Sequence, residues 1–388
     1  MNKFGFSGAV FDSRLVKPGM LYVALKGENA DGNDFIPMAK KAGASRIIGG
    51  PNALAELHDL AREYRLSLKD TVVVGLTGSA GKTTTKELLK CFLSSAGKTW
   101  ATQGNFNNHL GLPMTILNCP EDAKFLVLEM GTNHPGEIAA LCDIALPDSG
   151  LVTNIGTAHI EFFGTQEGIA EEKGTLLERA RDFGVVYSQC PRKEILKAKC
   201  RGEFVEAGMI GGKLARAVSE ILLGEHNLVN ASLAFALAAR YGVTEEGAAD
   251  SLKDFRLPGA RWRRVAKAGV DFIDDTYNAN PDAMKAALKA FLSEKTLGRR
   301  IAVLGDMFEL GEASARLHEE VFDYASSLGL HAVIAVGATA SRCRATHSFA
   351  TPGDLEAAFG DLFREGDLVL LKASNAMKLG RFAQSGTH

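Results

Sequence analysis

The stretch that decides the fold of this chain lies at residues 72–86 and reads Val72-Val73-Val74-Gly75-Leu76-Thr77-Gly78-Ser79-Ala80-Gly81-Lys82-Thr83-Thr84-Thr85-Lys86. It begins as an apolar run typical of a buried strand, continues as a glycine turn, and ends in residues that suit the start of a helix. Backbone N–H groups in such a turn, together with the positive end of the helix dipole, attract an anion. The pattern therefore predicts a phosphate-binding loop, although an ordinary strand-to-helix turn is the simpler alternative.

The side chains of this loop suit a nucleoside triphosphate. Lys82 can reach the β- and γ-phosphates, and the Thr83 hydroxyl can hold Mg²⁺. The usual pattern has glycine five residues before Gly81, where this chain has Leu76, and the glycine stands at Gly75 instead. The rest of the motif is intact, so we expect the nucleoside triphosphate to be bound by Gly78, Ser79, Ala80, Gly81, Lys82, Thr83 and Thr84.

The composition is typical of a soluble globular protein with several domains. The chain has 388 residues, of which 46% are hydrophobic and 23% charged, and a formal net charge of −2. This length predicts two to four domains of roughly 100–200 residues each. The near-neutral charge, without long basic blocks, argues against binding to nucleic acid or to an anionic membrane.

The cysteines and the apolar runs indicate the compartment. The six cysteines show no C-x-x-C spacing, which is typical of free thiols in a reducing environment. The first residues lack a signal-peptide pattern, and no apolar run is long enough to span a bilayer. We therefore expect a cytoplasmic protein without membrane insertion.

Short apolar runs alternate with helical patterns, which predicts parallel sheets and an α/β fold. Boundaries near residue 70 and after residue 256 divide the chain into domains at 1–70, 71–256 and 257–388. Beside the strand of the phosphate-binding loop, we predict strands at residues 21–25, 46–50, 125–130, 149–154, 270–273, 300–305, 331–336 and 367–372. We predict helices at residues 36–42, 53–64, 86–96, 165–181, 227–241, 244–255 and 315–328, and one that begins at residue 282.

Polar groups follow the predicted central strands, and ligands gather at the carboxyl ends of strands in such sheets. One strand ends near Glu129, and another leads through Asn154 into a loop that carries His159. Glu129 suits Mg²⁺, which prefers carboxylate and phosphate oxygens, but a helix cap or a solvated strand end would also explain it. His159 by itself is more typical of a structural histidine.

Other polar residues have both a functional and a structural interpretation. The run from Asn105 to Asn108 lies among glycines, which suits a loop near the phosphates or a plain turn. Lys173, judged by spacing alone, is a solvated helix position. Asn227 and Asn230 stand three residues apart at a predicted helix start, where asparagine can bind a purine edge or cap the helix. Capping explains one of these two asparagines rather than both.

Together these residues resemble the Mur ligase family, the ATP-dependent amide-bond ligases of peptidoglycan synthesis, over nearly the whole chain. The most similar branch adds D-alanyl-D-alanine to a UDP-N-acetylmuramoyl-tripeptide. The most specific motifs are Tyr277-Asn278-Ala279-Asn280-Pro281 and Gly305-Asp306-Met307-x-Glu309-Leu310-Gly311. The other matching segments are residues 12–14, 18–19, 24–27, 31–32, 34–35, 77–86, 104–108, 129–138, 153–159, 173–174, 226–230 and 274–276.

The resemblance implies a small α/β N-terminal domain for the uridine nucleotide, a central parallel-sheet ATPase domain, and a Rossmann-like C-terminal domain that closes over the site. It implies two Mg²⁺ sites, one held by Thr83 and Glu129 and one by His159 and Lys173, with Lys173 carbamylated into an anionic ligand. Lys82, Lys173 and His159 would be catalytic. It further implies contacts to ATP by Asn227, Asn230, Arg261 and Asp275, and to the substrates by Ser13, Arg14, Lys26, Asn105, Asn108, Tyr277, Asn278 and Asn280.

The reaction that the resemblance implies is phosphoryl transfer followed by acyl transfer. The tripeptide carboxylate would form an acyl phosphate with ATP, and the amine of D-alanyl-D-alanine would displace the phosphate. The protein would act as a monomer on these substrates. Two alternatives stay open: a ligase on the same scaffold with a different acceptor or amine, and a non-catalytic nucleotide-binding relative.

The sequence departs from the family pattern in three places. Only eleven residues precede Asp12, where the family has a further helix and strand, so the uridine nucleotide would meet a trimmed domain. The stretch at residues 183–224 is short. Lys372-Ala373-Ser374-Asn375 stands where the family has Lys-Gly-Ser-Arg. The last two departures leave the ATP chemistry intact and concern the second substrate.

Overall fold

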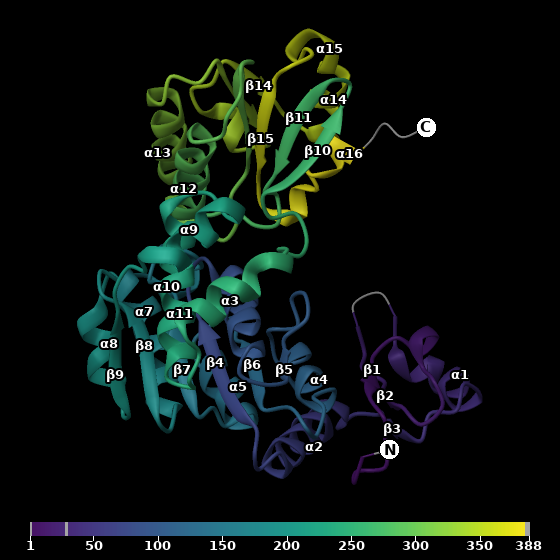
Figure 1. Ribbon diagram of the computed structural model, residues 1–388. Helices are drawn as coiled ribbons and strands as arrows, with labels where there is room; N and C mark the ends of the chain where they lie inside the picture. The colour runs from purple at the N-terminus through teal and green to yellow at the C-terminus, as the bar shows by residue number, and fades with distance from the viewer. Residues whose placement is uncertain (1, 28–29, 385–388) are drawn as a thin grey trace.

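Three β-sheets follow one another along the chain in the computed structural model, which describes residues 2–27 and 30–384 (Figure 1). A three-stranded sheet comes first, and two six-stranded sheets follow it. Neighbouring strands of these sheets run parallel except at one edge of the third sheet. The predicted α/β fold class is therefore confirmed, and the parallel pairing follows from the alternation of strands with helices.

The first sheet has the order β1-β2-β3 and is formed by β1 (Ala9–Val10), β2 (Leu21–Val23) and β3 (Arg46–Ile48), with helix α1 (Ile36–Lys41) beside it. The next helix, α2 (Ala53–Ser67), packs against α4 (Gly111–Leu117) and α5 (Glu137–Ala145) of the central domain. The buried Leu57, Leu60 and Tyr64 of α2 share one core with both sheets. Helix α2 therefore joins the first sheet to the central domain.

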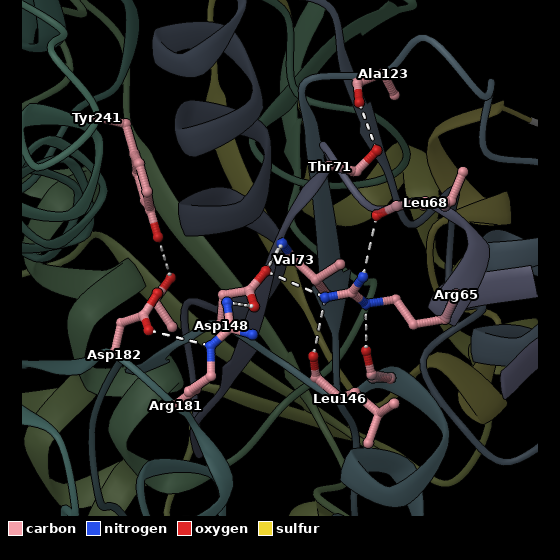
Figure 2. Close-up of polar contacts among 12 residues, drawn as sticks. Arg65, Leu68, Thr71, Val73, Ala123, Leu146, Asp148, Arg181, Asp182 and Tyr241 are labelled. Atoms are coloured by element: carbon pink, nitrogen blue, oxygen red, sulfur yellow. Dashed lines mark hydrogen bonds and ion pairs between the residues drawn. The ribbon is translucent and has the colours of Figure 1, made fainter.

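Arg65, near the end of α2, ties this helix to the central domain through buried polar contacts (Figure 2). Its guanidinium donates to the carbonyls of Ala145 at 3.0 Å and Leu146 at 3.2 Å, and it pairs with Asp148 at 3.2 Å. Asp148 also accepts the backbone N–H of Val73 at 2.7 Å. Both charges are buried and fully paired, the condition under which a buried ion pair is tolerated.

The central sheet has the order β5-β6-β4-β7-β8-β9, and all of its strands are parallel. Val74 and Leu76 of its middle strand face a core shared with α3 and α10, whereas Val73 faces a core shared with α5 and α7. The strands are β4 (Val72–Thr77), β5 (Thr99–Ala101), β6 (Phe125–Glu129), β7 (Ser149–Val152), β8 (Phe183–Tyr187) and β9 (Glu203–Ala207). The further helices are α3 (Lys82–Ser94), α6 (Ile160–Phe163), α7 (Gln166–Arg179), α8 (Lys193–Lys199), α9 (Gly212–Ile221), α10 (Glu225–Ala239) and α11 (Glu245–Ser251).

The third sheet has the order β10-β11-β15-β12-β13-β14, with only the edge strand β10 antiparallel to its neighbour. Helices cover both of its faces, which is the Rossmann-like arrangement that we predict. Its strands are β10 (Arg263–Lys267), β11 (Val270–Asp274), β12 (Arg300–Gly305), β13 (Ala332–Val336), β14 (His347–Phe349) and β15 (Leu368–Lys372). Its helices are α12 (Pro281–Leu292), α13 (Ser314–Ser327), α14 (Pro352–Ala357), α15 (Phe359–Leu362) and α16 (Arg381–Gln384).

The elements predicted from the sequence are present, with ends shifted by a few residues. The sequence patterns miss the short strands β1, β5 and β14, which are two or three residues long, and also the five-residue strands β8, β9 and β10. The missed helices are α4, α5, α6, α8, α9, α14, α15 and α16. The stretch at residues 183–224 forms β8, α8, β9 and α9. Within the described residues, no helix combines the length and the apolar character that crossing a bilayer requires.

Candidate functional site

The glycine-rich loop joins β4 to α3 at the carboxyl edge of the central sheet. Gly78 and Gly81 have φ angles of 153° and 77°, a backbone conformation that residues with a side chain rarely adopt. A Cβ atom at Gly78 would lie 1.8 Å from Thr153 Oγ1, so only glycine fits. Leu76, the position that departs from the usual motif, is a fully buried strand residue. The departure therefore alters the core of β4 and leaves the loop itself unchanged.

The residues that follow β7 hold this loop in place. The backbone N–H of Ser79 donates to the Asn154 carbonyl at 3.1 Å, and that of Ala80 donates to Asn154 Oδ1 at 2.8 Å. The Thr153 hydroxyl donates to the Ala80 carbonyl at 2.6 Å, and the backbone N–H of Gly156 donates to Ser79 Oγ at 2.9 Å. Two neighbouring strand ends thereby fix the loop before any ligand binds.

Lys82 is the first residue of α3, and its amine donates to the Gly78 carbonyl at 2.7 Å. Burial lowers the pKa of this amine, the Glu129 carboxylate opposes that shift, and Arg261 adds to it. The amine is thus held inside the loop, where an entering phosphate would find a donor that is already desolvated.

A chain of hydrogen bonds joins the C-terminal domain to the end of β6. Arg261 Nη2 donates to Thr83 Oγ1 at 2.9 Å, and the same hydroxyl donates to Glu129 Oε2 at 3.0 Å. The other carboxylate oxygen, Oε1, accepts a hydrogen bond from Asn107 Nδ2 at 2.8 Å. A hydroxyl and a carboxylate beside a phosphate-binding loop are the oxygen donors that Mg²⁺ prefers, so this pair fits that ion.

Lys173 and His159 form a second group of candidate residues. Lys173 lies on α7 and is only 1% exposed, and burial together with the charge of Lys82 holds its pKa well below the usual value. His159 directly precedes α6, and its Nδ1 lies 2.7 Å from Glu309 Oε2 of the C-terminal domain. This histidine contact lowers the pKa of the Glu309 carboxyl. Among the described residues, no three His, Cys, Asp or Glu side chains cluster as a metal site.

The C-terminal domain brings three of the predicted residues to the loop. The Arg261 guanidinium lies 3.4 Å from the centroid of the Tyr277 ring, a cation–π contact that orients the arginine. Asn280 precedes α12 and caps it, and its Nδ2 also donates to the Ser79 carbonyl at 3.5 Å. Arg261 and Asn280 therefore contact the loop and the start of α3, and Tyr277 supports Arg261.

Of the two candidate adenine residues, Asn230 lies against the loop. A Cβ atom added to Gly81 would lie 2.4 Å from Asn230 Oδ1. Neither asparagine is the N-cap of α10, because Gly224 occupies that position. Asn227 Nδ2 donates to a backbone carbonyl one turn earlier at 2.7 Å. Asp275, the fourth candidate for ATP binding, pairs with the Lys372 amine at 2.7 Å.

The remaining predicted substrate residues make contacts of their own: Ser13, Arg14, Lys26, Asn105, Asn108 and Asn278. Arg14 pairs with Asp12 at 2.6 Å on the surface, and the adjacent Ser13 is buried. The backbone of Lys26 forms an isolated antiparallel β-bridge with that of Asp31. The Asn108 side chain accepts two backbone N–H groups at the start of α4, and the Asn105 carbonyl accepts the N–H of residue 107. The Asn278 carbonyl accepts a hydrogen bond from the Lys372 amine.

Comparisons with known proteins agree with this arrangement. The profiles named Mur ligase family, catalytic domain, Mur ligase middle domain, and Mur ligase, glutamate ligase domain match residues 6–74, 76–218 and 260–375, respectively. The UDP-N-acetylmuramoyl-tripeptide–D-alanyl-D-alanine ligase of Bacillus subtilis is 34% identical over 421 residues, which cover 96% of this chain and 91% of that protein. The chain belongs to the Mur ligase family.

Other Mur ligases extend the likeness to the whole fold. The Escherichia coli protein of the same name is 31% identical over 388 residues, which cover 90% of this chain and 84% of that protein. A MurF structure from Acinetobacter baumannii superposes with a TM-score of 0.83 at 28% identity, over 97% of this chain and 92% of that one. The structure of MurF from Thermotoga maritima in complex with ADP superposes with a TM-score of 0.82 at 30% identity, over 99% of this chain and 98% of that one.

Three polar residues of this Mur ligase site were not among the predicted site residues. Asn107 and Asn154 lie within segments that match the Mur ligase family, in loops beside strand ends. That position in the sequence could have identified them as site residues. Glu309 lies in the Gly-Asp-Met-x-Glu-Leu-Gly motif, but the motif alone did not reveal its partner. Each of the three acts on a neighbouring site residue: Asn107 on Glu129, Asn154 on the loop, and Glu309 on His159.

Proposed function

We propose that this chain is an ATP-dependent ligase that joins D-alanyl-D-alanine to a UDP-N-acetylmuramoyl-tripeptide, the substrates that its relatives' names describe. The observation that carries the proposal is the hydrogen-bond chain from Arg261 through Thr83 to Glu129, beside Lys82. It assembles a triphosphate loop, a fitting cation site and an arginine from another domain. A passive nucleotide-binding protein does not require that combination.

In the first step the tripeptide carboxylate attacks the γ-phosphorus of ATP. The bond from that phosphorus to the β–γ bridging oxygen breaks, leaving ADP and an acyl phosphate. The Lys82 amine would exchange the Gly78 carbonyl for a γ-phosphate oxygen, where negative charge develops. Arg261 of the C-terminal domain would add a second positive charge beside it.

Thr83 and Glu129 would hold Mg²⁺. When bound, this ion neutralises charge on the phosphate oxygens. The chain prepares the carboxylate for it, because Asn107 holds one oxygen of Glu129 and the Thr102 hydroxyl accepts the Glu129 backbone N–H at 3.0 Å. Such supporting contacts fix the orientation of a ligand in advance.

We also propose that Lys173 carries a carbamate and serves a second Mg²⁺ together with His159. Burial and the charge of Lys82 hold the pKa of this amine well below its usual value, which favours the neutral form that can add to CO₂. The new N–C bond forms with loss of one proton and leaves an anionic carboxylate at the end of the side chain. That group would supply an anionic oxygen ligand for the second ion.

In the second step the amine of the dipeptide attacks the acyl carbon. The C–O bond to phosphate breaks, phosphate leaves with the electron pair, and the nitrogen loses a proton. Water must be excluded while the acyl phosphate exists. Arg261, Tyr277 and Asn280 would achieve this by holding the C-terminal domain against the loop.

A second candidate is a ligase of the same type with a different amine substrate, and one observation favours it. Asn375 occupies the position where the family pattern has arginine. The neighbouring Lys372 is bound to Asp275, and Ser374 Oγ accepts the backbone N–H of Phe308 at 3.0 Å. Neither compensates for the missing arginine, so the carboxylate of the incoming amine would be recognised differently.

The cellular setting follows from the proposed substrates. A ligase that consumes ATP and a nucleotide-linked precursor would act in the cytoplasm. We propose that it acts as a monomer, because the residues of the site all come from one chain.

The deciding experiment measures phosphate release from ATP by the purified protein with Mg²⁺ and the UDP-linked tripeptide, with and without D-alanyl-D-alanine. We expect release to depend on both substrates and the product to be heavier by the dipeptide. Release that depends on the tripeptide and a different amine would favour the second candidate. Absence of release with either amine would contradict both.

A further inference from the structure

Arg261 reaches the start of α3 from the short segment that precedes β10. Its guanidinium donates to Thr83 Oγ1 at 2.9 Å and to the Pro258 carbonyl at 3.2 Å, and it lies over the Tyr277 ring. The backbone N–H of Tyr277 in turn donates to the Ala260 carbonyl at 3.2 Å. These contacts hold the guanidinium and the backbone that leads into Arg261. The backbone that leads out of it is held by the side chain of the next residue.

That next residue, Trp262, has a strained backbone. Its φ is 54°, in the left-handed region that bulky side chains rarely adopt. Such a conformation persists only where the surrounding contacts impose it. The indole ring packs against the core of the C-terminal domain, and its Nε1–H donates to Glu294 Oε1 at 2.9 Å. The indole contacts therefore hold the turn that follows Arg261.

Glu294 is a well-fixed acceptor for this hydrogen bond. It lies just after the end of α12 and is only 5% exposed. Its backbone N–H donates to the Phe291 carbonyl at 3.2 Å, and its own carbonyl accepts Arg300 Nη2 at 2.8 Å. Its second carboxylate oxygen pairs with Arg264. A buried carboxylate with both oxygens engaged cannot turn away from the indole without losing partners that are costly to lose.

A purely structural turn would not require a tryptophan at this position. Glycine adopts the left-handed region at little cost, and the same segment uses it at Gly259, where φ is 77°. At Trp262 the strain is accepted together with a large side chain that has its own buried partner. Strained residues of this kind are typical of functional sites, and this one adjoins the arginine that contacts the phosphate-binding region.

We propose that Trp262 and Glu294 are positioning residues that act through Arg261. The hydrogen bond from indole to carboxylate holds the strained turn, and the turn directs the guanidinium toward Thr83 and the phosphate-binding loop. Neither positioning residue needs to touch ATP or another substrate in this role. The inference rests on the proposed function for the positive charge that Arg261 offers to the γ-phosphate.

The test uses Trp262→Phe, which keeps an aromatic ring and removes the N–H, and Glu294→Leu, which removes the acceptor. The matched control is Trp100→Phe, because the chain's other tryptophan also donates its indole N–H, to the Thr115 carbonyl at 3.0 Å in the central domain. Each variant is made alone and together with Arg261→Ala. Calorimetry measures the Kd of a non-hydrolysable ATP analogue with Mg²⁺, phosphate release measures kcat, and thermal melting reports folding.

We expect Trp262→Phe and Glu294→Leu to lower kcat about 10–100-fold and to weaken binding of the analogue, because a displaced guanidinium no longer meets the phosphate. Glu294→Gln should lose less, since its amide oxygen still accepts from the indole. Trp100→Phe should keep the wild-type kcat and Kd. In protein that already carries Arg261→Ala, Trp262→Phe should have almost no further effect on kcat or Kd, because the residue through which it acts is gone.

The indole N–H signals of the two tryptophans, observed by nuclear magnetic resonance, report the hydrogen bonds directly. Glu294→Leu should shift the Trp262 signal and leave that of Trp100 in place. Additive losses in the double variant, or equal kcat in Trp262→Phe and Trp100→Phe, would overturn the inference. The analogue titration needs no acceptor or amine. Failure of ligation with D-alanyl-D-alanine, together with non-additive changes in Kd, would therefore count against the proposed function alone.

Discussion

The two edges of the central sheet hold buried charge in contrasting ways. At the amino-terminal edge, Arg65 and Asp148 pair with each other, and the remaining donors of Arg65 reach backbone carbonyls (Figure 2). At the carboxyl edge, Lys82 donates only to a backbone carbonyl, and Lys173 is buried with a depressed pKa. A buried charge that is paired is tolerated by the fold and costly to unpair, whereas an ionisable group whose pKa is strongly shifted by burial is typical of a functional site.

Strand β7 connects these two edges. Asp148 immediately precedes it and accepts hydrogen bonds from α2 and β4, while Asn154 follows it and fixes the phosphate-binding loop. The same short strand thus carries a structural carboxylate at its start and a site-forming amide at its end. This asymmetry is general in parallel sheets, where ligands bind at the carboxyl ends of the strands.

The largest effect is expected from Lys82→Ala, which should impair catalysis strongly and stability hardly at all. The substitution removes the amine that would stabilise charge on the γ-phosphate, so we expect kcat for phosphate release to fall about 10³-fold. The melting temperature should stay within a few degrees of wild type, because Lys82 makes its hydrogen bond within the loop alone. Steady-state phosphate release and thermal melting check both points, and unchanged ligation would show that the site is assigned wrongly.

The opposite pattern is expected from Arg65→Ala. It removes the buried partner of Asp148, which keeps the Val73 N–H and the largely exposed Arg181. The free energy of unfolding should therefore fall by about 3 kcal/mol, the lower end of the range for a broken buried ion pair, while kcat of the protein that remains folded is unchanged. Urea unfolding combined with activity per folded molecule measures this. A variant with normal stability and poor catalysis would contradict the assignment of this edge to structure.

The phosphate-binding loop could be predicted from the sequence because its parts are contiguous. Strand, glycines, lysine and hydroxyls all fall between Val72 and Lys86. The contact of His159 with Glu309 could not, because it joins two domains and depends on their relative placement. Strands of two or three residues are also a weak signal: β1 and β14 are missed, although β2 and β3, of three residues each, are predicted from short apolar runs.

Lys173 shows how spacing alone can mislead. Its neighbours Glu171 and Glu172 suggest a solvated helix face, yet Lys173 is 1% exposed. The reason is that the Glu172 carboxylate accepts backbone N–H groups from Gly136 and Ile138 at the start of α5, both at 2.8 Å. Glu172 and Lys173 therefore both lie in the interior. From the sequence, only the family resemblance indicates a role for Lys173.

Lys173→Ala tests whether the buried amine belongs to the functional edge. We expect kcat to fall by at least about 10²-fold, since a cation ligand is lost, and added bicarbonate should not restore it. Lys197→Ala, an exposed lysine on α8, is the control and should behave as wild type. Mass spectrometry under native conditions would look for the extra carboxylate on wild-type protein. Full activity in Lys173→Ala would contradict the carbamate proposal.

The smallest effect is expected from Arg181→Ala at the structural edge. Arg181 pairs with Asp148 at 2.6 Å, but its side chain is 73% exposed, against 10% for Arg65. Water therefore screens the interaction, and the loss of unfolding free energy should not exceed about 1 kcal/mol. It should shrink further in 1 M salt, whereas the loss caused by Arg65→Ala should persist there. Urea unfolding at low and high salt separates the two arginines. If Arg181→Ala lost as much unfolding free energy as Arg65→Ala, burial would not be what distinguishes a structural ion pair from an incidental one at this edge.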